Sequence, residues 1–245
     1  MKPFLLLASR AEDAAADEEY AAFLQFGGLE EPELVRVRLE QRPLGAINLT
    51  DYSGIIIGGS PFNSSDAPEA KSDIQRRVEQ ELSALLDQVI AADFPVLGAC
   101  YGVGVVGTHE GGVIDRTYGE PVGAVPVTLT EEGRHDPVFG VLPPSFEAFV
   151  GHKEAVRTLP PNAVLLASSP RCPVQAFRVG ENVYATQFHP ELDVAGISTR
   201  IDVYRHAGYF EPDEADTVKA MARGSGVQHP PVVLRRFVER YAQAA

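Results

Sequence analysis

The chain has 245 residues and a formal net charge of −13, from 21 Lys and Arg against 34 Asp and Glu. A surface of this sign repels a phosphate backbone and an anionic membrane leaflet, so we expect neither nucleic acid nor a membrane as a partner. Hydrophobic residues make up 44% and charged residues 22% of the chain, which is typical of a folded globular protein and excludes a disordered one.

The number of cysteines and the length of the uncharged stretches indicate the cellular compartment. Cys100 and Cys172 are too few for a disulfide framework in 245 residues, which predicts a reducing environment. The longest uncharged stretch, residues 94–109, contains glycines and has 16 residues, whereas a membrane span needs about 20 apolar ones. Charges follow the apolar run at residues 4–7 too soon for a secretory signal. We therefore expect a soluble, cytoplasmic protein.

Short apolar runs bounded by turn residues predict buried strands in the N-terminal part of the chain. They are Phe4–Ala8, Leu34–Leu39, Gly54–Ile57 and Pro95–Ala99. Between the last two, residues 69–92 carry apolar side chains at three- and four-residue steps, which predicts an amphipathic helix. Strand, crossover helix and strand form a βαβ unit, and unbroken apolar runs are typical of parallel strands covered on both faces. This part is predicted as doubly wound α/β.

The second half of the chain has a different pattern of predicted strands and helices. Strand-like segments follow one another between residues 112 and 188, at 125–129, 163–167, 174–179 and 183–188. Helical segments return from Ala195, and the last is an amphipathic piece at Val232–Tyr241. We find no internal repeat and no long linker. The prediction is a single domain over residues 1–245, a three-layer α/β fold with a mostly parallel sheet, in which residues 193–245 form a helical C-terminal extension.

A candidate nucleophile lies at the end of the fourth predicted strand. Residues 98–102 read Gly-Ala-Cys-Tyr-Gly, and a tight strand-to-helix turn needs small residues two before and two after a nucleophile that it lifts above the sheet. The helix N-terminus favours a thiolate at Cys100, and the N–H of Tyr101 is placed to donate to an oxyanion. The alternative is a buried, inert cysteine.

The same stretch also matches G-x-G-x-x-G through Gly102, Gly104 and Gly107, a pattern of dinucleotide-binding loops. That fingerprint belongs to the first βα turn of a fold, and here it follows a later strand. We therefore explain the glycines by the turn geometry and by close helix–strand packing.

A thiol nucleophile needs a base and a third group that orients the base. His189 follows the apolar strand at 183–188, and Glu191 lies two residues further on. A lone histidine at a strand end is more often structural. In combination with Cys100, however, the order Cys, His, Glu predicts a catalytic triad.

Together these motifs resemble the class I glutamine amidotransferase family. The resemblance covers about residues 3–192 and rests on the segments 98–102 and 187–191, and on Ile55–Pro61, which resembles the glycine loop after the family's third strand. It implies the flavodoxin-like fold of that family. It also implies that the backbone amides of Gly59 and Tyr101 form the oxyanion hole.

What the resemblance implies for activity is hydrolysis of the side-chain amide of glutamine. Cys100 would attack the carbonyl, His189 would protonate the departing ammonia, and a γ-glutamyl thioester would remain for water to hydrolyse. In the family the ammonia passes to an acceptor on a synthetase domain or subunit. Residues 192–245 contain no Gly-rich phosphate loop, so any acceptor chemistry is expected on another chain. The resemblance implies no cofactor.

The resemblance further implies Gly58, Gly104, His152 and Lys153 as substrate-binding residues. Gly104 stands where the family usually has Gln, four residues after the nucleophile, and Lys153 stands where a Gly usually follows the histidine of the second substrate loop. Lys153 is long enough to reach an α-carboxylate, and the alternative is that it lies on the surface. These departures leave two alternatives open: a γ-glutamyl hydrolase or peptidase acting on a compound other than glutamine, and a non-catalytic binding protein on the same scaffold.

Other polar residues are predicted to have ordinary roles. Histidines 109, 135, 206 and 229 lack metal-ligand spacing, so we expect no zinc site. Cys172 is predicted to be structural. The acidic run between Glu12 and Glu19 is predicted to be the solvated face of a helix.

Overall fold

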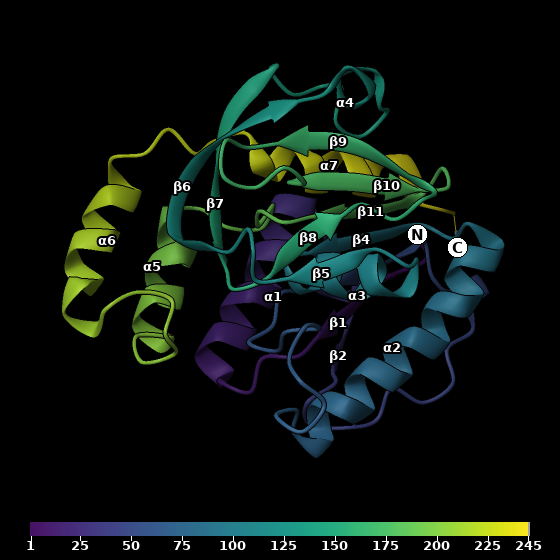
Figure 1. The fold of residues 1–245 in the computed structure, drawn as a ribbon. Helices are drawn as coiled ribbons and strands as arrows, with labels where there is room; N and C mark the ends of the chain where they lie inside the picture. The colour runs from purple at the N-terminus through teal and green to yellow at the C-terminus, as the bar shows by residue number, and fades with distance from the viewer. Residues whose placement is uncertain (245) are drawn as a thin grey trace.

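The structure, a computed structural model, describes residues 1–244 and contains one large sheet and one small one (Figure 1). The strands are β1 (Phe4–Ala8), β2 (Leu34–Arg38), β3 (Gly54–Ile57), β4 (Val96–Ala99), β5 (Val113–Asp115), β6 (Glu120–Leu129), β7 (Ser145–His152), β8 (Ala155–Thr158), β9 (Ala163–Ser168), β10 (Ala176–Val179) and β11 (Val183–Thr186). The helices are α1 (Asp13–Gly27), α2 (Asp73–Ala92), α3 (Tyr101–His109), α4 (Glu131–His135), α5 (Val194–Val203), α6 (Ala215–Arg223) and α7 (Pro230–Tyr241). In this part of the chain no helix combines the length and the apolar character needed to cross a membrane.

The large sheet has nine strands in the order β2-β1-β3-β4-β11-β10-β9-β6-β7. Strands β2, β1, β3, β4 and β11 pair in parallel, and the strands beyond β11 pair antiparallel. The parallel half ends at one edge, where the loops after β1, β3, β4 and β11 come together, because the carboxyl ends of parallel strands share an edge. Ligands bind at this edge in open α/β sheets.

Helices cover both faces of the parallel half, because alternate side chains of each strand point to opposite faces. Phe4 and Leu6 of β1 belong to a core with side chains of α1 and α7, including Phe23 and Phe237. Leu5 and Leu7 belong to a second core with side chains of α2 and α3. The result is the predicted three-layer α/β architecture.

The segment after residue 193 contains α5, α6 and α7. Helices α5 and α6 lie at the end of the molecule beside β6 and β7 (Figure 1), and their apolar side chains pack on Phe149 and Leu192. Helix α7 returns to the sheet and packs against α1. This return of α7 to the main core supports the proposal of a single domain.

Several boundaries differ from the prediction. Helix α2 begins at Asp73, not at residue 69, because the Ser72 side chain caps it by accepting a hydrogen bond from Gln75 N. Strand β6 begins at Glu120, five residues before the predicted 125, and the prediction lacks β5, β7 and β8. Many side chains of β5, β6 and β8 are only partly buried or exposed, so the apolar pattern of these three strands is weak.

Candidate active site

Cys100 occupies the turn between β4 and α3 in a strained backbone conformation. Its φ of 52° and ψ of −85° are rare for a residue with a side chain and cost about 1–3 kcal/mol. The turn is held by Cys100 N, which donates to Thr186 O at 2.7 Å. A β-carbon on Gly98 would lie 2.9 Å from Gly102 Cα, so the close approach of α3 to β4 leaves no room for a side chain at Gly98. This is the tight strand-to-helix turn that the sequence predicts at Cys100.

His189 and Glu191 follow β11 at the same edge of the sheet. His189 Nδ1 donates to Glu191 Oε1 at 2.8 Å, which leaves Nε2 for the reacting groups. Both side chains are buried, and Glu191 is 0% exposed. The backbone of His189 is fixed by its amide, which donates to Phe149 O at 3.1 Å.

The two side chains shift each other's protonation. Burial by itself lowers the pKa of His189, but the charges of Glu191 and Cys100 outweigh it and raise the pKa to about 9. Burial by itself raises the pKa of Glu191, but the charges of His189 and Arg200 hold it well below its ordinary range. At neutral pH the pair is therefore an imidazolium beside a carboxylate.

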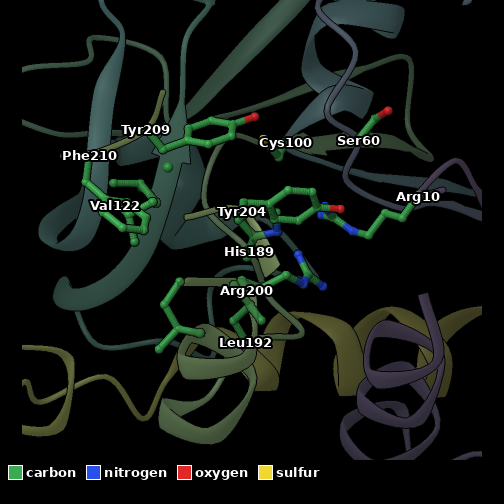
Figure 2. Close-up of a pocket in the computed structure, with 13 residues that line it drawn as sticks. Arg10, Ser60, Cys100, Val122, His189, Leu192, Arg200, Tyr204, Tyr209 and Phe210 are labelled. Carbon is green, nitrogen blue, oxygen red and sulfur yellow. The ribbon is translucent and has the colours of Figure 1, made fainter. Parts of the chain in front are cut away.

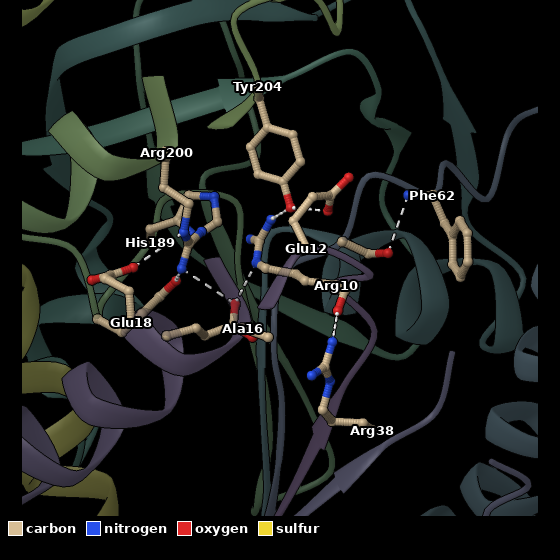
Figure 3. A network of polar contacts seen from close by, with 12 residues as sticks. Arg10, Glu12, Ala16, Glu18, Arg38, Phe62, His189, Arg200 and Tyr204 are labelled. Carbon is tan, nitrogen blue, oxygen red and sulfur yellow. Dashed lines mark hydrogen bonds and ion pairs between the residues drawn. The ribbon is translucent and has the colours of Figure 1, made fainter. Parts of the chain in front are cut away.

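Arg200 of α5 contacts the carboxylate of this pair (Figure 3). Its Nη2 lies 3.4 Å from Glu191 Oε1 and 3.4 Å from Glu19 Oε1, and its Nε donates to Glu18 Oε2 at 3.3 Å. A cation at this place holds the Glu191 carboxylate ionised and in position. Helix α5, which begins soon after Glu191 in sequence, thereby orients the hydrogen-bond partner of His189.

Arg10 continues the network from the end of β1. Its Nε donates to Glu19 Oε1 at 2.9 Å and its Nη1 to Tyr204 Oη at 3.2 Å. Tyr204 in turn donates to Glu12 Oε2 at 3.1 Å. Figure 3 shows Arg10 between Tyr204 and α1, so the guanidinium is fixed on two sides.

The role of Glu19 corrects the prediction that the acidic run of α1 is solvated. Glu12, Asp13 and Asp17 are exposed, as predicted. Glu19 is 0% exposed because the helical period puts it on the inner face with Ala15 and Ala22. It serves as the shared counter-ion of two buried arginines.

Two cavities reach Cys100 from different sides. The cavity that we call the His189 pocket is lined by Arg10, Ser60, Cys100, Val122, Val150, Gly151, His189, Leu192, Ile197, Arg200, Tyr204, Tyr209 and Phe210 (Figure 2). The smaller Tyr101 pocket is lined by Ser60, Phe62, Asn63, Cys100, Tyr101, His152, Lys153, Glu154, Gln187 and Tyr209. Cys100, Ser60 and Tyr209 line both, so the two cavities meet at the sulfur.

The predicted oxyanion donors lie next to these cavities. Neither Gly59 N nor Tyr101 N donates to an acceptor among residues 1–244. Tyr101 N belongs to the first turn of α3, where N–H groups lack helical partners. Both amides are therefore available to a ligand.

Of the predicted substrate-binding residues, the two glycines have their side-chain space filled by protein. A β-carbon on Gly58 would lie 2.8 Å from Glu19 Oε2, away from both cavities. A β-carbon on Gly104 would lie 2.5 Å from Glu154 Oε1 and 2.6 Å from Ser64 Oγ. Glu154 thus fills the space beside Gly104, and it accepts hydrogen bonds from the backbone amides of Ser64 and Ser65 at 2.8 and 2.7 Å.

His152 and Lys153 line the Tyr101 pocket, but their polar atoms already have protein partners. His152 Nδ1 lies 2.8 Å from Glu154 O, and its Nε2 lies 3.1 Å from Glu120 Oε2. Lys153 Nζ donates to Ala207 O at 2.6 Å and lies 4.7 Å from the centre of the Tyr209 ring. The loop at 204–210 is held over the site by this lysine.

Glu120, His152 and Cys172 form a buried group whose potential ligand atoms lie within 4.8 Å of one another. Gln175 Nε2 donates to Glu120 Oε2 at 2.8 Å, and the thiol of Cys172 donates to Val174 O at 3.4 Å. Burial raises the pKa of Cys172 to about 12, which opposes the thiolate that a metal or a nucleophile requires. A structural role for Cys172, as predicted, fits this environment.

Sequence reasoning missed Arg10, Arg200, Glu154 and Tyr209. One of them had a usable signal: Arg10 directly follows β1, whose carboxyl end meets those of β3, β4 and β11. Arg200 and Tyr209 come from the C-terminal segment, and only the tertiary fold brings them to the site.

Comparison with known proteins identifies the family. Residues 29–199 match the family model of glutamine amidotransferase class-I. A separate subunit of the glutamine-hydrolysing GMP synthase of Thermococcus kodakarensis is 31% identical over 67% of this chain and 78% of that relative. The glutamine-hydrolysing GMP synthase of Petrotoga mobilis is 26% identical over 60% of this chain, but the match spans only 26% of its own length.

Solved structures agree on the fold. A glutamine amidotransferase from Thermotoga maritima superposes with a TM-score of 0.77 at 18% identity, over 100% of both chains. A glutamine amido transferase from Methylobacillus flagellatus gives 0.72 at 18% identity, over 100% of this chain and 97% of its own. The chain belongs to the class I glutamine amidotransferase family, as the sequence motifs predict, and is therefore an enzyme of that class.

Proposed function

We propose that the enzyme hydrolyses the side-chain amide of glutamine through Cys100. The thiolate of Cys100 attacks the amide carbonyl, the C–N bond breaks, ammonia leaves and a γ-glutamyl thioester remains. Water then attacks the thioester, which releases glutamate and the free thiol. The observation that carries this proposal is the strained Cys100 turn, which lines one cavity together with His189, the hydrogen-bond partner of Glu191.

His189 moves the protons in both half-reactions. With its pKa raised to about 9, the ring is protonated at neutral pH, where it stabilises the Cys100 thiolate and holds a proton for the departing ammonia. Once neutral, the same ring takes a proton from the attacking water. Glu191 keeps the proton on Nδ1 and balances the charge of the imidazolium, and Arg200 orients Glu191.

The backbone amides of Gly59 and Tyr101 stabilise the oxyanion that forms in each attack. Their lack of protein acceptors supports this role, and one such donor is worth about 3–4 kcal/mol of transition-state stabilisation. The glutamyl arm occupies the Tyr101 pocket, the side of the sulfur away from His189. There Lys153 gives up its hydrogen bond to Ala207 O and binds the α-carboxylate of the substrate instead.

Gly104 and His152 shape this pocket through their neighbours, whereas Gly58 makes room for Glu19 outside it. The absence of a side chain at Gly104 admits Glu154, and His152 holds the backbone of that residue. Glu154 is therefore the polar side chain beside Gly104, the position at which other family members usually carry Gln.

We further propose that the ammonia is passed to an acceptor on another chain. The Thermococcus relative is by name one subunit of a glutamine-hydrolysing GMP synthase, and it is matched over most of its length. A separate synthetase subunit is therefore the expected class of partner.

The test measures glutamate and ammonia release from glutamine by the purified chain and by Cys100→Ala. We expect Cys100→Ala to abolish turnover while retaining the wild-type circular dichroism spectrum. Cys172→Ala is the matched control and is expected to keep the activity, because Cys172 lies outside both pockets. Normal turnover by Cys100→Ala would overturn the proposal.

A further inference from the structure

The His189 pocket is larger than a departing ammonia requires. Because His189 protonates the leaving nitrogen, the group attached to that nitrogen leaves on the side of the sulfur where His189 lies. That side is a cavity of about 40 Å³, whereas one water-sized molecule needs roughly 10–15 Å³ on the same measure, and its lining contains two arginines (Figure 2). Ammonia fills only part of such a space.

Arg10 presents an unused donor to this cavity. Its Nε and Nη1 are engaged by Glu19 and Tyr204, whereas Nη2 has no acceptor among residues 1–244. A β-carbon on Gly59 would overlap Arg10 Nη2 and lie 2.8 Å from His189 Cε1, so Nη2 is beside the reaction centre. Arg10 is 4% exposed and therefore preorganised, and a guanidinium is suited to binding a carboxylate.

Beyond the catalytic side chains and the arginines, the lining is mostly apolar. It consists of Val122, Val150, Leu192, Ile197 and Phe210, with the rings of Tyr204 and Tyr209, and of Ser60 and Gly151. Arg200, the other cation, is already engaged by three carboxylates. The cavity thus combines one available guanidinium donor with walls that fit a hydrocarbon side chain.

We propose that the His189 pocket binds the leaving group of a γ-glutamyl amide of an apolar α-amino acid, with Arg10 binding the carboxylate of that amino acid. The inference rests on the proposed function, because the same thioester forms at Cys100. The C–N bond breaks, the proton of His189 goes to the leaving nitrogen, and the free amino acid departs in place of ammonia. Hydrolysis of the thioester then yields glutamate, so the net reaction consumes one water.

The test compares γ-glutamyl-phenylalanine, γ-glutamyl-phenethylamine and glutamine as substrates of the wild-type chain. The first two differ only in the carboxylate that Arg10 is proposed to bind. A charge-assisted hydrogen bond of this kind changes kcat/KM by roughly tenfold or more, so we expect at least that preference for the phenylalanine compound. Because this comparison uses the wild type, it does not depend on the folding of any variant.

Variants then assign the preference to Arg10. Arg10→Gln and Arg10→Lys are expected to bring the ratio of kcat/KM for the two compounds close to one. Arg36→Gln is the matched control, since Arg36 pairs with Asp17 outside both pockets, and it is expected to keep the wild-type ratio.

Two results would overturn the proposal alone: equal hydrolysis of the two compounds by wild type, or turnover of glutamine without turnover of either. The absence of Cys100-dependent hydrolysis of all three substrates would overturn the proposed function and this inference with it.

Discussion

Replacing His189 by Gln should remove the pH dependence of the unfolding free energy that arises from the His189–Glu191 pair. The pKa of His189 is about 9 in the folded chain, against 6.5 for an ordinary histidine. Between these values the folded chain keeps a proton that the unfolded chain has released, so the free energy of unfolding falls as the pH rises. Each pH unit in this window lowers the free energy of unfolding by about 1.4 kcal/mol, and the whole window lowers it by about 3 kcal/mol.

The stabilisation is therefore present in full below pH 6.5 and lost once the pH passes about 9. Urea unfolding followed by far-UV circular dichroism measures it, since the chain has no tryptophan for a fluorescence assay. The informative quantity is the unfolding free energy of wild type minus that of His189→Gln, measured across this window. His206→Gln, which removes an exposed histidine, controls for the loss of a histidine elsewhere.

We expect this difference to decline by about 3 kcal/mol as the pH rises through the window. A difference that stays flat, or one that grows with pH, would contradict the imidazolium–carboxylate pair. The decline should also shrink in Cys100→Ala, because the sulfur contributes to the raised pKa of His189.

Three further predictions concern the framework of the site. Cys100→Gly should raise stability by about 1 kcal/mol while abolishing activity, because glycine adopts a φ of 52° without steric cost; a lower melting temperature would contradict the strain. Gly98→Ala should cost about 1–3 kcal/mol and lower turnover, because the new methyl group would lie 2.9 Å from Gly102 Cα, and wild-type values in both assays would refute this reason. Arg200→Met should cost about 3–5 kcal/mol in urea unfolding, because it removes the guanidinium shared by Glu18, Glu19 and Glu191; a neutral result would mean that the network is not coupled.

The parts of the site that the sequence predicts correctly are those fixed by local backbone geometry. The order Gly-Ala-Cys-Tyr-Gly after an apolar run specifies a tight strand-to-helix turn, and Cys100 occupies it. His189 and Glu191 are close in sequence and follow a parallel strand next to β4, so their proximity to Cys100 follows from strand order. The central strands of the parallel half, β1, β3 and β4, were predictable for the same reason, because they are unbroken apolar runs.

The remaining parts depend on contacts between distant segments. In the sequence, Glu19 does not differ from the exposed acids near it. Its role depends on Arg10 and Arg200, which the fold brings to it from the end of β1 and from α5. Strand β7 carries exposed and buried side chains at the end of the sheet, so its composition alone does not distinguish it from a loop. The loop at 204–210 contacts the site only because α5 and α6 pack on β6 and β7.

If Cys100 is a nucleophile in a pocket for a γ-glutamyl group, a glutamine-like electrophile should label it. Intact and peptide mass spectrometry after treatment with such an electrophile measures this labelling, with iodoacetamide as a parallel control for bare thiol reactivity. We expect one adduct, on the peptide that contains Cys100, and protection by excess glutamine. Labelling of Cys172 instead, or the absence of glutamine-protected labelling on Cys100, would show that Cys100 is not this nucleophile.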